Sequence, residues 1–385
     1  MKVVMTLLAR DAADIVDAQV AFHLNAGVDF VVATDNLSRD GTTQILERYE
    51  RSGVLHLIRE DGKDMRQAEW VTRMARLAAT DFDADWVINA DADEFWWPRT
   101  GTLKAILAAV PDRFGVVRAG WRHFVPRPDD GRFFAERMTA RLRWPAHPGD
   151  KRTVFHAHQK VAHRGDARVV VEAGNHDVYG PDMEPLRSWL PIEVLHFSFR
   201  GPEQLKRKAS GGWQFRDPRT VVDHQARLRN AWREHRIDDF WARVVVDDDA
   251  LERGIERGRY ATDTRLRDAL RQLGEPNVSF GLNTPAHLSL PSSTVVEDAD
   301  FAAELAPLWS IEGIARAENR VAALDGRLAA IERTWPTAPV GKATVTRVSS
   351  LAGRVRDLAR VRAARSPKLA ATSRHPRKLA VPSLR

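Results

Sequence analysis

The sequence predicts an α/β fold built on a mostly parallel sheet with helices on its faces. Over about the first 100 residues, short apolar runs rich in β-branched residues alternate with longer segments whose apolar residues recur at helical spacing. Acidic residues follow two of the apolar runs, at Asp35 and at residues 91–94. Ligands of such sheets bind beyond the carboxyl ends of the strands, so these acids are candidate site residues.

The first part of the chain contains four predicted strands and three predicted helices in alternation. Strands are expected where β-branched residues cluster in short apolar runs, at 2–9, 30–33, 54–58 and 86–88. Helices are expected at 14–25, 40–49 and 66–79. The segment Asn25-Ala26-Gly27 ends the first helix, and Asp40 is expected to cap the second. The order β-α-β-α-β-α-β favours parallel strands joined by helical crossovers.

The remaining chain is less regular. Shorter strands are expected at 115–118, 139–144, 159–162, 169–172 and 192–199, and helices at 204–213 and 223–241. A polar linker follows from Gly274 to about Ser293, and a further helical stretch spans 302–333. We therefore predict a catalytic α/β domain over residues 1–215, a helical extension with a linker over 216–340, and a basic tail over 341–385.

The positive charge is concentrated in that tail. Residues 341–385 contain twelve Lys or Arg against the single acid Asp357, a net of +11, whereas the whole chain has a net charge of +7. Residues 1–340 therefore sum to −4. A mildly acidic body gives little electrostatic support for nucleic-acid binding, which we regard as an unfavoured function.

Composition and hydropathy exclude several classes of protein. The chain has no cysteine, which excludes a disulfide scaffold, a cysteine-ligated zinc site and a cysteine nucleophile. No apolar run approaches the roughly 18 to 20 residues that cross a bilayer. The first residues are apolar only as far as Ala9 and lack the core of a signal peptide, so they read as a buried strand and the protein is expected in the cytoplasm.

The sharpest chemical signal is Asp91-Ala92-Asp93 at the end of the fourth predicted strand. In an extended segment residues i and i+2 face the same way, so both carboxylates project together from the sheet edge. Two adjacent acids repel unless a cation lies between them, and oxygen ligands suit Mg²⁺ or Mn²⁺. Such a site can hold a diphosphate and neutralise its charge as it departs. The structural alternative is a solvated strand end.

A second polar segment, Thr34 to Thr42, follows the second strand. Its plain interpretation is a turn that leads into a helix. An acid at that strand end, Asp35, is also placed to accept a hydrogen bond from a nucleoside.

Together these segments resemble family 2 glycosyltransferases of the GT-A fold. The similarity rests on Asp35-Asn36-x-Ser38-x-Asp40-Gly41-Thr42 and on Asp85-Trp86-Val87-x-x-x-Asp91-Ala92-Asp93-Glu94-Phe95. It is strongest to the bacterial branch in which Gly174-Asn175-His176 precedes His196-Phe197-x-x-Arg200-x-x-Glu203-Gln204-x-x-x-Lys208. The resemblance covers roughly residues 1–215.

The resemblance implies a GT-A-like (Rossmann-like) domain, a nucleotide-sugar donor, inverting glycosyl transfer and Mn²⁺ or Mg²⁺ as cofactor. By position, Asp35 would contact the nucleoside, Asp91 and Asp93 the metal diphosphate, and His196 would complete the metal or phosphate contacts. The sequence departs from the family at Ala12, where an acid is usual and where Asp11 or Asp14 would have to substitute, and at Leu37, which replaces a glycine.

Cations and a base complete the expected site. Arg200 and Lys208, with Gln204 in the same motif, are candidates to line the donor diphosphate, and Lys160 would add a further cation; the alternative is a helix with a solvated basic face. Inverting transfer needs a base for the acceptor hydroxyl. The candidates are Glu94, His176 and Asp177 in that order, although Glu94 could instead orient a metal ligand.

Two other features of the sequence have more than one interpretation. Trp96 and Trp97 are expected to pack in the core in preference to stacking on a sugar. Residues 342–385 form a basic amphipathic segment that is either a solvated helix or a contact with the anionic inner face of the plasma membrane. The second interpretation would suit a saccharide or lipid-linked acceptor in cell-surface polysaccharide or glycolipid synthesis. The rival functions are a metal-dependent phosphohydrolase and a non-catalytic nucleotide- or sugar-binding protein.

Overall fold

The computed structural model describes residues 1–63, 66–146, 153–187, 189–210, 223–274, 288 and 290–292. The chain divides into two compact units, Met1–Pro307 and Leu308–Arg385, and all of the described residues belong to the first unit. The helix predicted at 302–333 and the basic tail at 341–385 lie outside the described residues.

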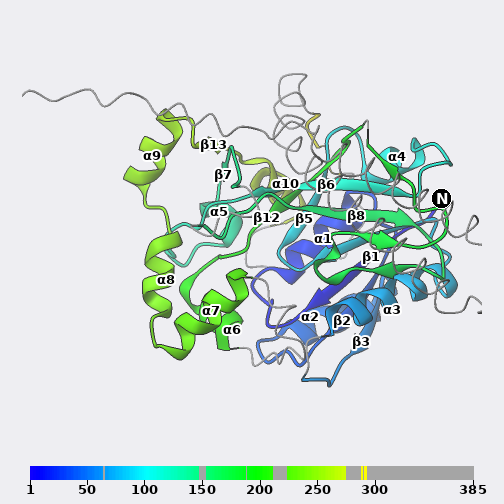
Figure 1. The fold of residues 1–385 in the computed structure, drawn as a ribbon, viewed down its shortest axis with the longest axis horizontal. Helices are drawn as coiled ribbons and strands as arrows, with labels where there is room; N and C mark the ends of the chain where they lie inside the picture. Colours follow the sequence, from blue (N-terminus) through cyan, green and yellow to red (C-terminus); the bar gives the residue numbers. More distant parts are fainter. Residues whose placement is uncertain are drawn as a thin grey trace, which may run out of the picture. The chain divides into compact units, whose positions relative to one another are not determined.

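A nine-stranded sheet forms the centre of the first unit (Figure 1). Its main path runs β3-β2-β1-β4-β8-β6-β12-β5, and β11 pairs with β6. The first four strands are all parallel, as are β6, β11 and β12, whereas β8 and β5 run antiparallel to their neighbours. The strands are β1 Val3–Ala9, β2 Phe30–Asp35, β3 Leu55–Arg59, β4 Trp86–Asp91, β5 Glu94–Pro98, β6 Val116–His123, β8 Gln159–Arg164, β11 Pro185–Leu186 and β12 Ile192–His196.

Two short ribbons lie outside this sheet. They pair β9 Val170–Val171 with β10 Val178–Tyr179, and β7 Ala140–Leu142 with β13 Tyr260–Thr262. The helices are α1 Val16–Asn25, α2 Thr42–Arg51, α3 Gln67–Thr80, α4 Leu103–Ala108, α5 Phe134–Arg137, the 3-10 turn η1 Ala173–Asn175, α6 Pro202–Ser210, α7 Asp223–Arg233, α8 Ile237–Val244, α9 Asp248–Glu256 and α10 Arg265–Leu273.

Helices cover both faces of the sheet, and β1 shows why. Its alternate residues belong to different clusters: Met5 and Leu7 pack with α1, α2, α4 and α10, whereas Val4 and Leu8 pack with α3. A strand that is buried on both faces needs a continuous apolar run, which is what β1 provides. A third apolar cluster holds α6, α7 and α8 together. The predicted α/β class with a mostly parallel sheet and helices on its faces is therefore confirmed, and further helices follow it along the chain.

Local details differ from the sequence prediction at three places. The single helix expected at 223–241 is two helices, because His235 adopts a left-handed φ of 55° between α7 and α8. The N-cap of α2 is Gly41, at φ 102°, and the Asp40 carboxylate accepts the N–H of Thr42 instead. The strand β5 was not anticipated, since residues 94–98 read as a continuation of the acidic motif.

The sheet brings distant residues to one edge. The end of β1 lies between the ends of β2 and β4, with Ala9 beside Asp35 and Leu8 beside Asp91. Beyond a tight turn, β5 runs antiparallel to β12, which sets His196 opposite Glu94. His196 is also opposite His123 of β6. Among the described helices, none is long and apolar enough to cross a membrane.

Candidate active site

Three potential metal ligands converge where β4 turns into β5. One ligand atom from each of Asp93, Glu94 and His196 lies within 4.8 Å of the other two. The Asp93 carboxylate also lies 3.2 Å from the ammonium of Lys208 on α6. Burial alone would raise the pKa of Asp93, but the charge of Lys208 and other nearby cations holds it below its ordinary value. Asp93 is therefore an anion.

Hydrogen bonds determine which nitrogen of His196 carries its proton. His123 Nε2 lies 2.6 Å from the carbonyl oxygen of His156, which can only accept, so His123 Nε2 is the donor. Burial lowers the pKa of His123 to about 4, so the ring is neutral and its Nδ1 is an acceptor. His196 Nδ1 lies 3.3 Å from that atom and must donate.

The lone pair of His196 is consequently on Nε2. Burial also lowers the pKa of His196 well below its ordinary value, so this ring is neutral as well. Nε2 lies 3.7 Å from a carboxylate oxygen of Asp93. The lone pair of Nε2 and the carboxylate oxygen face each other at a separation that a shared cation would fit. A histidine that binds a metal is usually neutral, with its other ring nitrogen in a hydrogen bond, as it is here.

Asp91 has a different environment from Asp93. Lys160 Nζ lies 2.6 Å from Asp91 and 2.8 Å from Glu94, and the lysine side chain is 1% exposed. The other Asp91 oxygen accepts hydrogen bonds from Gln67 and Asn175. Glu94 is fully buried, which raises its pKa against the opposing charge of Lys160. Asp91 therefore compensates the buried ammonium of Lys160, and Glu94 accepts a second contact from it.

Trp121 of β6 connects these groups. Its indole N–H donates to Glu94 over 2.9 Å, its ring stacks on His196 at a centroid distance of 4.1 Å, and Lys160 lies over it at 5.2 Å. The rings of His158 and His176 also pack against Trp121, at 5.2 and 5.6 Å. A single half-buried side chain thus contacts an acid, a buried ammonium and a candidate metal ligand.

The predicted diphosphate-binding residues divide into two groups. Lys208 keeps 31% of its side chain exposed while it contacts Asp93, so it can reach a ligand. Arg200 forms two hydrogen bonds with Asp14, at 2.6 and 2.9 Å, and a third with the carbonyl of Phe197. Gln204 bonds the main chain of Arg200 and Ser198. These two side chains hold the segment between β12 and α6, and Lys208 on that helix contacts Asp93.

The turn after β2 is a compact polar loop. Asp35 is 4% exposed and accepts hydrogen bonds from the hydroxyls of Ser38 and Thr43, both at 2.5 Å. Leu37, in place of the family's glycine, adopts a left-handed φ of 57°, a conformation that costs a non-glycine residue about 1–2 kcal/mol. Asp14, a candidate to replace the acid that Ala12 lacks, forms an ion pair with Arg200. The turn interpretation therefore holds for this segment.

His176 and Asp177 directly follow Asn175, the last residue of η1. His176 Nδ1 donates to the carbonyl of Gln159 over 2.7 Å, so Nε2 is its basic nitrogen. The ring stacks on His158 at 4.9 Å and is half-buried. Asp177 lies 3.5 Å from the guanidinium of Arg118. Of these two candidates, His176 is the one that packs against Trp121, which in turn contacts Glu94 and His196.

Sequence reasoning missed Gln67, Trp121 and His123. Nothing in their local sequence marks them. Gln67 reaches Asp91 from the start of α3, and the positions of Trp121 and His123 follow from the pairing of β6 with β8 and β12. Trp96 and Trp97 are fully buried, which confirms their expected place in the core.

Comparisons with known proteins give low similarities. No protein-family model and no curated protein matches the chain. Among solved structures it is similar to S. aureus TarS 1–349 in complex with UDP-GlcNAc, at 13% identity over 60% of this chain and 71% of that chain, with a TM-score of 0.34. Glucosyl-3-phosphoglycerate synthase from Mycobacterium tuberculosis, in complex with Mn²⁺, UDP and glucosyl-3-phosphoglycerate, is 18% identical over 31% and 44%, with a TM-score of 0.23.

A 4-diphosphocytidyl-2C-methyl-D-erythritol synthase is 13% identical over 43% of this chain and 75% of its own, with a TM-score of 0.25. Similarities of this size leave the chemistry of the chain to be argued from the site itself.

Proposed function

We propose that this protein is a divalent-metal-dependent glycosyltransferase of the GT-A-like class, which moves a sugar from a nucleotide-sugar donor to an acceptor hydroxyl with inversion. The observation that carries the proposal is the arrangement of Asp93, His196 and Lys208. An anionic carboxylate faces the lone pair of a neutral imidazole at 3.7 Å, and an exposed ammonium lies 3.2 Å from the same carboxylate. This combination suits a cation and the diphosphate that accompanies it.

Asp93 and His196 would hold the Mn²⁺ or Mg²⁺, with Glu94 beside them. The bound cation would neutralise the charge that develops on the departing diphosphate. Lys208 would bind the same diphosphate because it is exposed and adjacent. Asp91, which the sequence assigns to the metal, would act through Lys160: the buried ion pair keeps Lys160 and Glu94 in place. Arg200 and Gln204 would position α6, and with it Lys208.

The nucleoside is proposed to lie over the ends of β1 and β2. Asp35 lies at this edge at the end of β2, and β1 separates β2 from β4 and its acids. One Asp35 oxygen accepts a hydrogen bond from Ser38 and the other accepts one from Thr43, so a ribose hydroxyl or a base N–H would add to or replace one of these bonds.

Deprotonation of the acceptor is assigned to His176. Glu94 is fully buried and accepts hydrogen bonds from Trp121, Lys160 and the Asp91 backbone, which suits a group that orients others. His176 is half-buried, neighbours Trp121, and has Nε2 as its basic nitrogen. A histidine with this geometry can accept the hydroxyl proton as the sugar is attacked.

Calorimetric titration tests the proposal. UDP, GDP, CDP and TDP are each titrated, with and without Mn²⁺, into the wild type, Asp93→Ala and the control Asp112→Ala, an exposed acid remote from the site. We expect one nucleotide to bind only with Mn²⁺, to lose binding in Asp93→Ala and to keep it in Asp112→Ala. Metal-independent binding, or equal binding by both variants, would contradict the proposed metal site.

Turnover then separates the rival functions. With the matching nucleotide sugar, acceptor-dependent release of the nucleoside diphosphate supports a transferase. Phosphate release from p-nitrophenyl phosphate that Asp93→Ala abolishes would support a phosphohydrolase. Metal-dependent nucleotide binding without transfer to any of a broad set of acceptors would support a non-catalytic binding protein.

The basic segment 342–385 is proposed to attach the enzyme to an anionic membrane surface, where a lipid-linked acceptor would be available. Co-sedimentation with vesicles of phosphatidylglycerol should be lost when this segment is deleted. Sedimentation of the deleted protein at the wild-type level would contradict membrane attachment through these residues.

A further inference from the structure

Lys208 and the proposed metal ion would share one carboxylate, that of Asp93. Lys208 Nζ lies 3.2 Å from one oxygen of this carboxylate, and the other oxygen lies 3.7 Å from Nε2 of His196. His196 is neutral and presents a lone pair, whereas Lys208 brings a positive charge. A divalent cation held by Asp93 and His196 would therefore be repelled by the ammonium that already contacts the same carboxylate.

Asp93 needs a positive partner when no metal is bound. Its side chain is only 16% exposed, and a carboxylate that is so poorly solvated is costly without a compensating charge. Burial raises the pKa of Asp93, and the charge of Lys208 is the largest of the opposing effects, which together bring that pKa below its ordinary value. Lys208 thus compensates Asp93 in the metal-free protein, as a bound cation would.

Lys160 and Lys208 both contact the acidic motif, but they differ in their freedom to leave it. Lys160 is 1% exposed and lies 2.6 Å from Asp91 and 2.8 Å from Glu94. Lys208 is 31% exposed and lies 3.2 Å from Asp93. An exposed ammonium on a flexible four-carbon stem can turn to another anion, whereas the buried Lys160 would lose two close partners at once.

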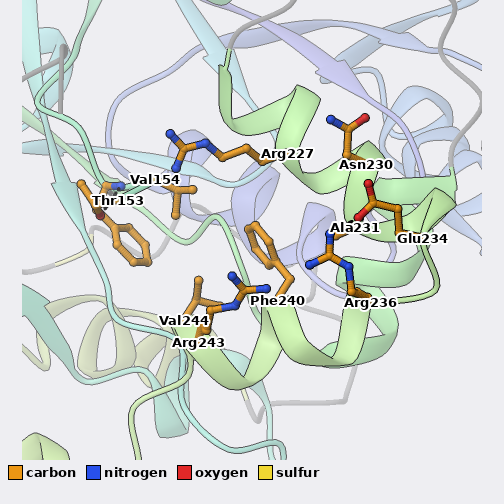
Figure 2. Close-up of a pocket in the computed structure, with 11 residues that line it drawn as sticks. Thr153, Val154, Arg227, Asn230, Ala231, Glu234, Arg236, Phe240, Arg243 and Val244 are labelled. Carbon is orange, nitrogen blue, oxygen red and sulfur yellow. Dashed lines mark hydrogen bonds and ion pairs between the residues drawn. The ribbon is translucent and has the colours of Figure 1, made fainter. Parts of the chain in front are cut away.

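The helix that carries Lys208 is held in place, so such a movement would be confined to the side chain. Leu205 and Ala209, on either side of it in α6, are buried in the apolar cluster that α6 shares with α7 and α8. Lys208 Nζ lies 5.8 Å from the ring of Phe199, which packs on Phe240 at a centroid distance of 5.8 Å. Figure 2 shows Phe240 in the pocket between α7 and α8.

We propose that Lys208 couples binding of the metal ion to binding of the donor diphosphate. Without a diphosphate, the ammonium remains on Asp93 and opposes the cation. With a diphosphate present, the ammonium contacts phosphate oxygens, which lysine recognises well, and Asp93 is released to the cation. The inference rests on the proposed function and adds its regulation: the metal alone binds weakly, whereas metal and nucleotide strengthen each other by the same factor.

Two simpler roles of Lys208 have different consequences. If Lys208 only bound the diphosphate, its replacement would leave the affinity for Mn²⁺ alone unchanged. If Lys208 only held α6 against the acidic motif, its replacement would leave Asp93 less well ordered and would not improve metal binding. Only the removal of a competing positive charge should make Mn²⁺ alone bind more tightly.

Electron paramagnetic resonance titration, which measures free Mn²⁺, tests the coupling. Mn²⁺ is titrated alone and with each of UDP, GDP, CDP and TDP into the wild type, Lys208→Gln, Lys208→Arg and Lys206→Gln. Lys206 is the matched control, because it lies on the same helix, is 34% exposed and forms ion pairs with Glu203 and Asp238 instead of the acidic motif.

We expect Lys208→Gln to bind Mn²⁺ alone at least about fivefold more tightly than the wild type. In saturating Mn²⁺ this variant should bind the nucleotide about tenfold more weakly, because a charged contact with the diphosphate is lost. Lys208→Arg, which keeps the charge, and Lys206→Gln should both bind Mn²⁺ alone within about twofold of the wild type.

Unchanged or weaker binding of Mn²⁺ alone by Lys208→Gln would overturn the coupling role, as would an equal gain in Lys208→Arg or Lys206→Gln. Tighter binding of Mn²⁺ with unchanged nucleotide affinity would also overturn it, since Lys208 would then not serve the diphosphate. Each of these failures leaves metal-dependent nucleotide binding intact in the wild type. Its absence from the wild type would instead overturn the proposed function, and the coupling with it.

Discussion

The Nδ1 atoms of His196 and His123 lie 3.3 Å apart, and His196 is the donor in this hydrogen bond. His123 donates its Nε2 proton to the carbonyl oxygen of His156, because that oxygen can only accept. The Nδ1 of His123 is therefore an acceptor, and His196 must donate to it. His123 thereby keeps the lone pair of His196 on the nitrogen that faces Asp93. In the proposed metal site, His123 would position His196 without itself touching the metal.

Substitution of His123 should weaken metal binding. His123→Leu removes the acceptor and lets His196 adopt the other tautomer, so Mn²⁺ affinity should fall by about 10- to 100-fold. His123→Asn, whose amide oxygen can occupy the place of Nδ1, should recover most of that loss. Electron paramagnetic resonance titration of Mn²⁺ measures both variants. Equal affinities for His123→Leu and the wild type would contradict the positioning role.

Substitutions of Glu94 and His176 should affect different steps, the first nucleotide binding and the second turnover. Glu94→Gln removes a carboxylate oxygen from the group that would hold the cation, so Mn²⁺-dependent nucleotide affinity should fall by about tenfold. His176→Ala should leave that affinity unchanged and lower kcat for transfer by about 10²- to 10⁴-fold. Asp177→Asn is the comparison, with little loss expected. Should Glu94→Gln retain nucleotide affinity and lose turnover, Glu94 would be the base, as its position in the sequence first indicates.

Glu193 should be important for stability. It is 2% exposed and lies 2.7 Å from both Arg122 and Arg265, so it ties α10 to the sheet. Glu193→Gln removes a buried anion that pairs with Arg122 and Arg265 and should lower the free energy of unfolding by about 3–5 kcal/mol. Glu136→Gln breaks an ion pair between α5 and the exposed Arg271 of the same α10, and should cost about 1 kcal/mol or less.

Urea denaturation compares these two variants. A similar loss of stability in both would show that burial of Glu193 contributes nothing beyond an ordinary surface ion pair.

The protein should lose stability in mild acid because of buried neutral histidines. His23 donates from Nδ1 to Gln19 and accepts from the backbone N–H of Trp96, which fixes it as neutral, and burial lowers its pKa to about 4. The unfolded chain, with an ordinary pKa of about 6.5, binds the proton first. The contribution of His23 is thus intact above pH 6.5 and decreases as the pH falls toward 4.

This loss should reach about 2 kcal/mol at pH 5. Unfolding free energies of the wild type and His23→Leu, measured between pH 7.5 and 5, give the difference. The variant should be less stable at pH 7.5, and the gap should narrow by that amount as the pH falls. A constant gap would show that His23 has the same proton affinity in the folded and unfolded chain.

The sequence predicted the parallel part of the sheet well because the information there is local. A strand buried on both faces needs an uninterrupted apolar run, and Val3–Ala9 is one. The helix break at His235 could not be foreseen, since an apolar pattern continues across it and only the packing of α7 on α8 requires the turn. The same limit applies to β5, whose residues pair with β12 almost a hundred positions later.

The sequence by itself predicted the fold class and the acidic motif at the end of β4, because these follow from local periodicity and from residue chemistry at short spacing. His196 and Lys208 became candidates through the resemblance to a known family. Only the tertiary structure decided how the acids divide their work: Asp93 faces His196 and Lys208, whereas Asp91 and Glu94 enclose Lys160. That division depends on the pairing of β4, β8, β6, β12 and β5. The order of these strands is set by the burial of whole faces of the sheet, and no short segment of the sequence contains that information.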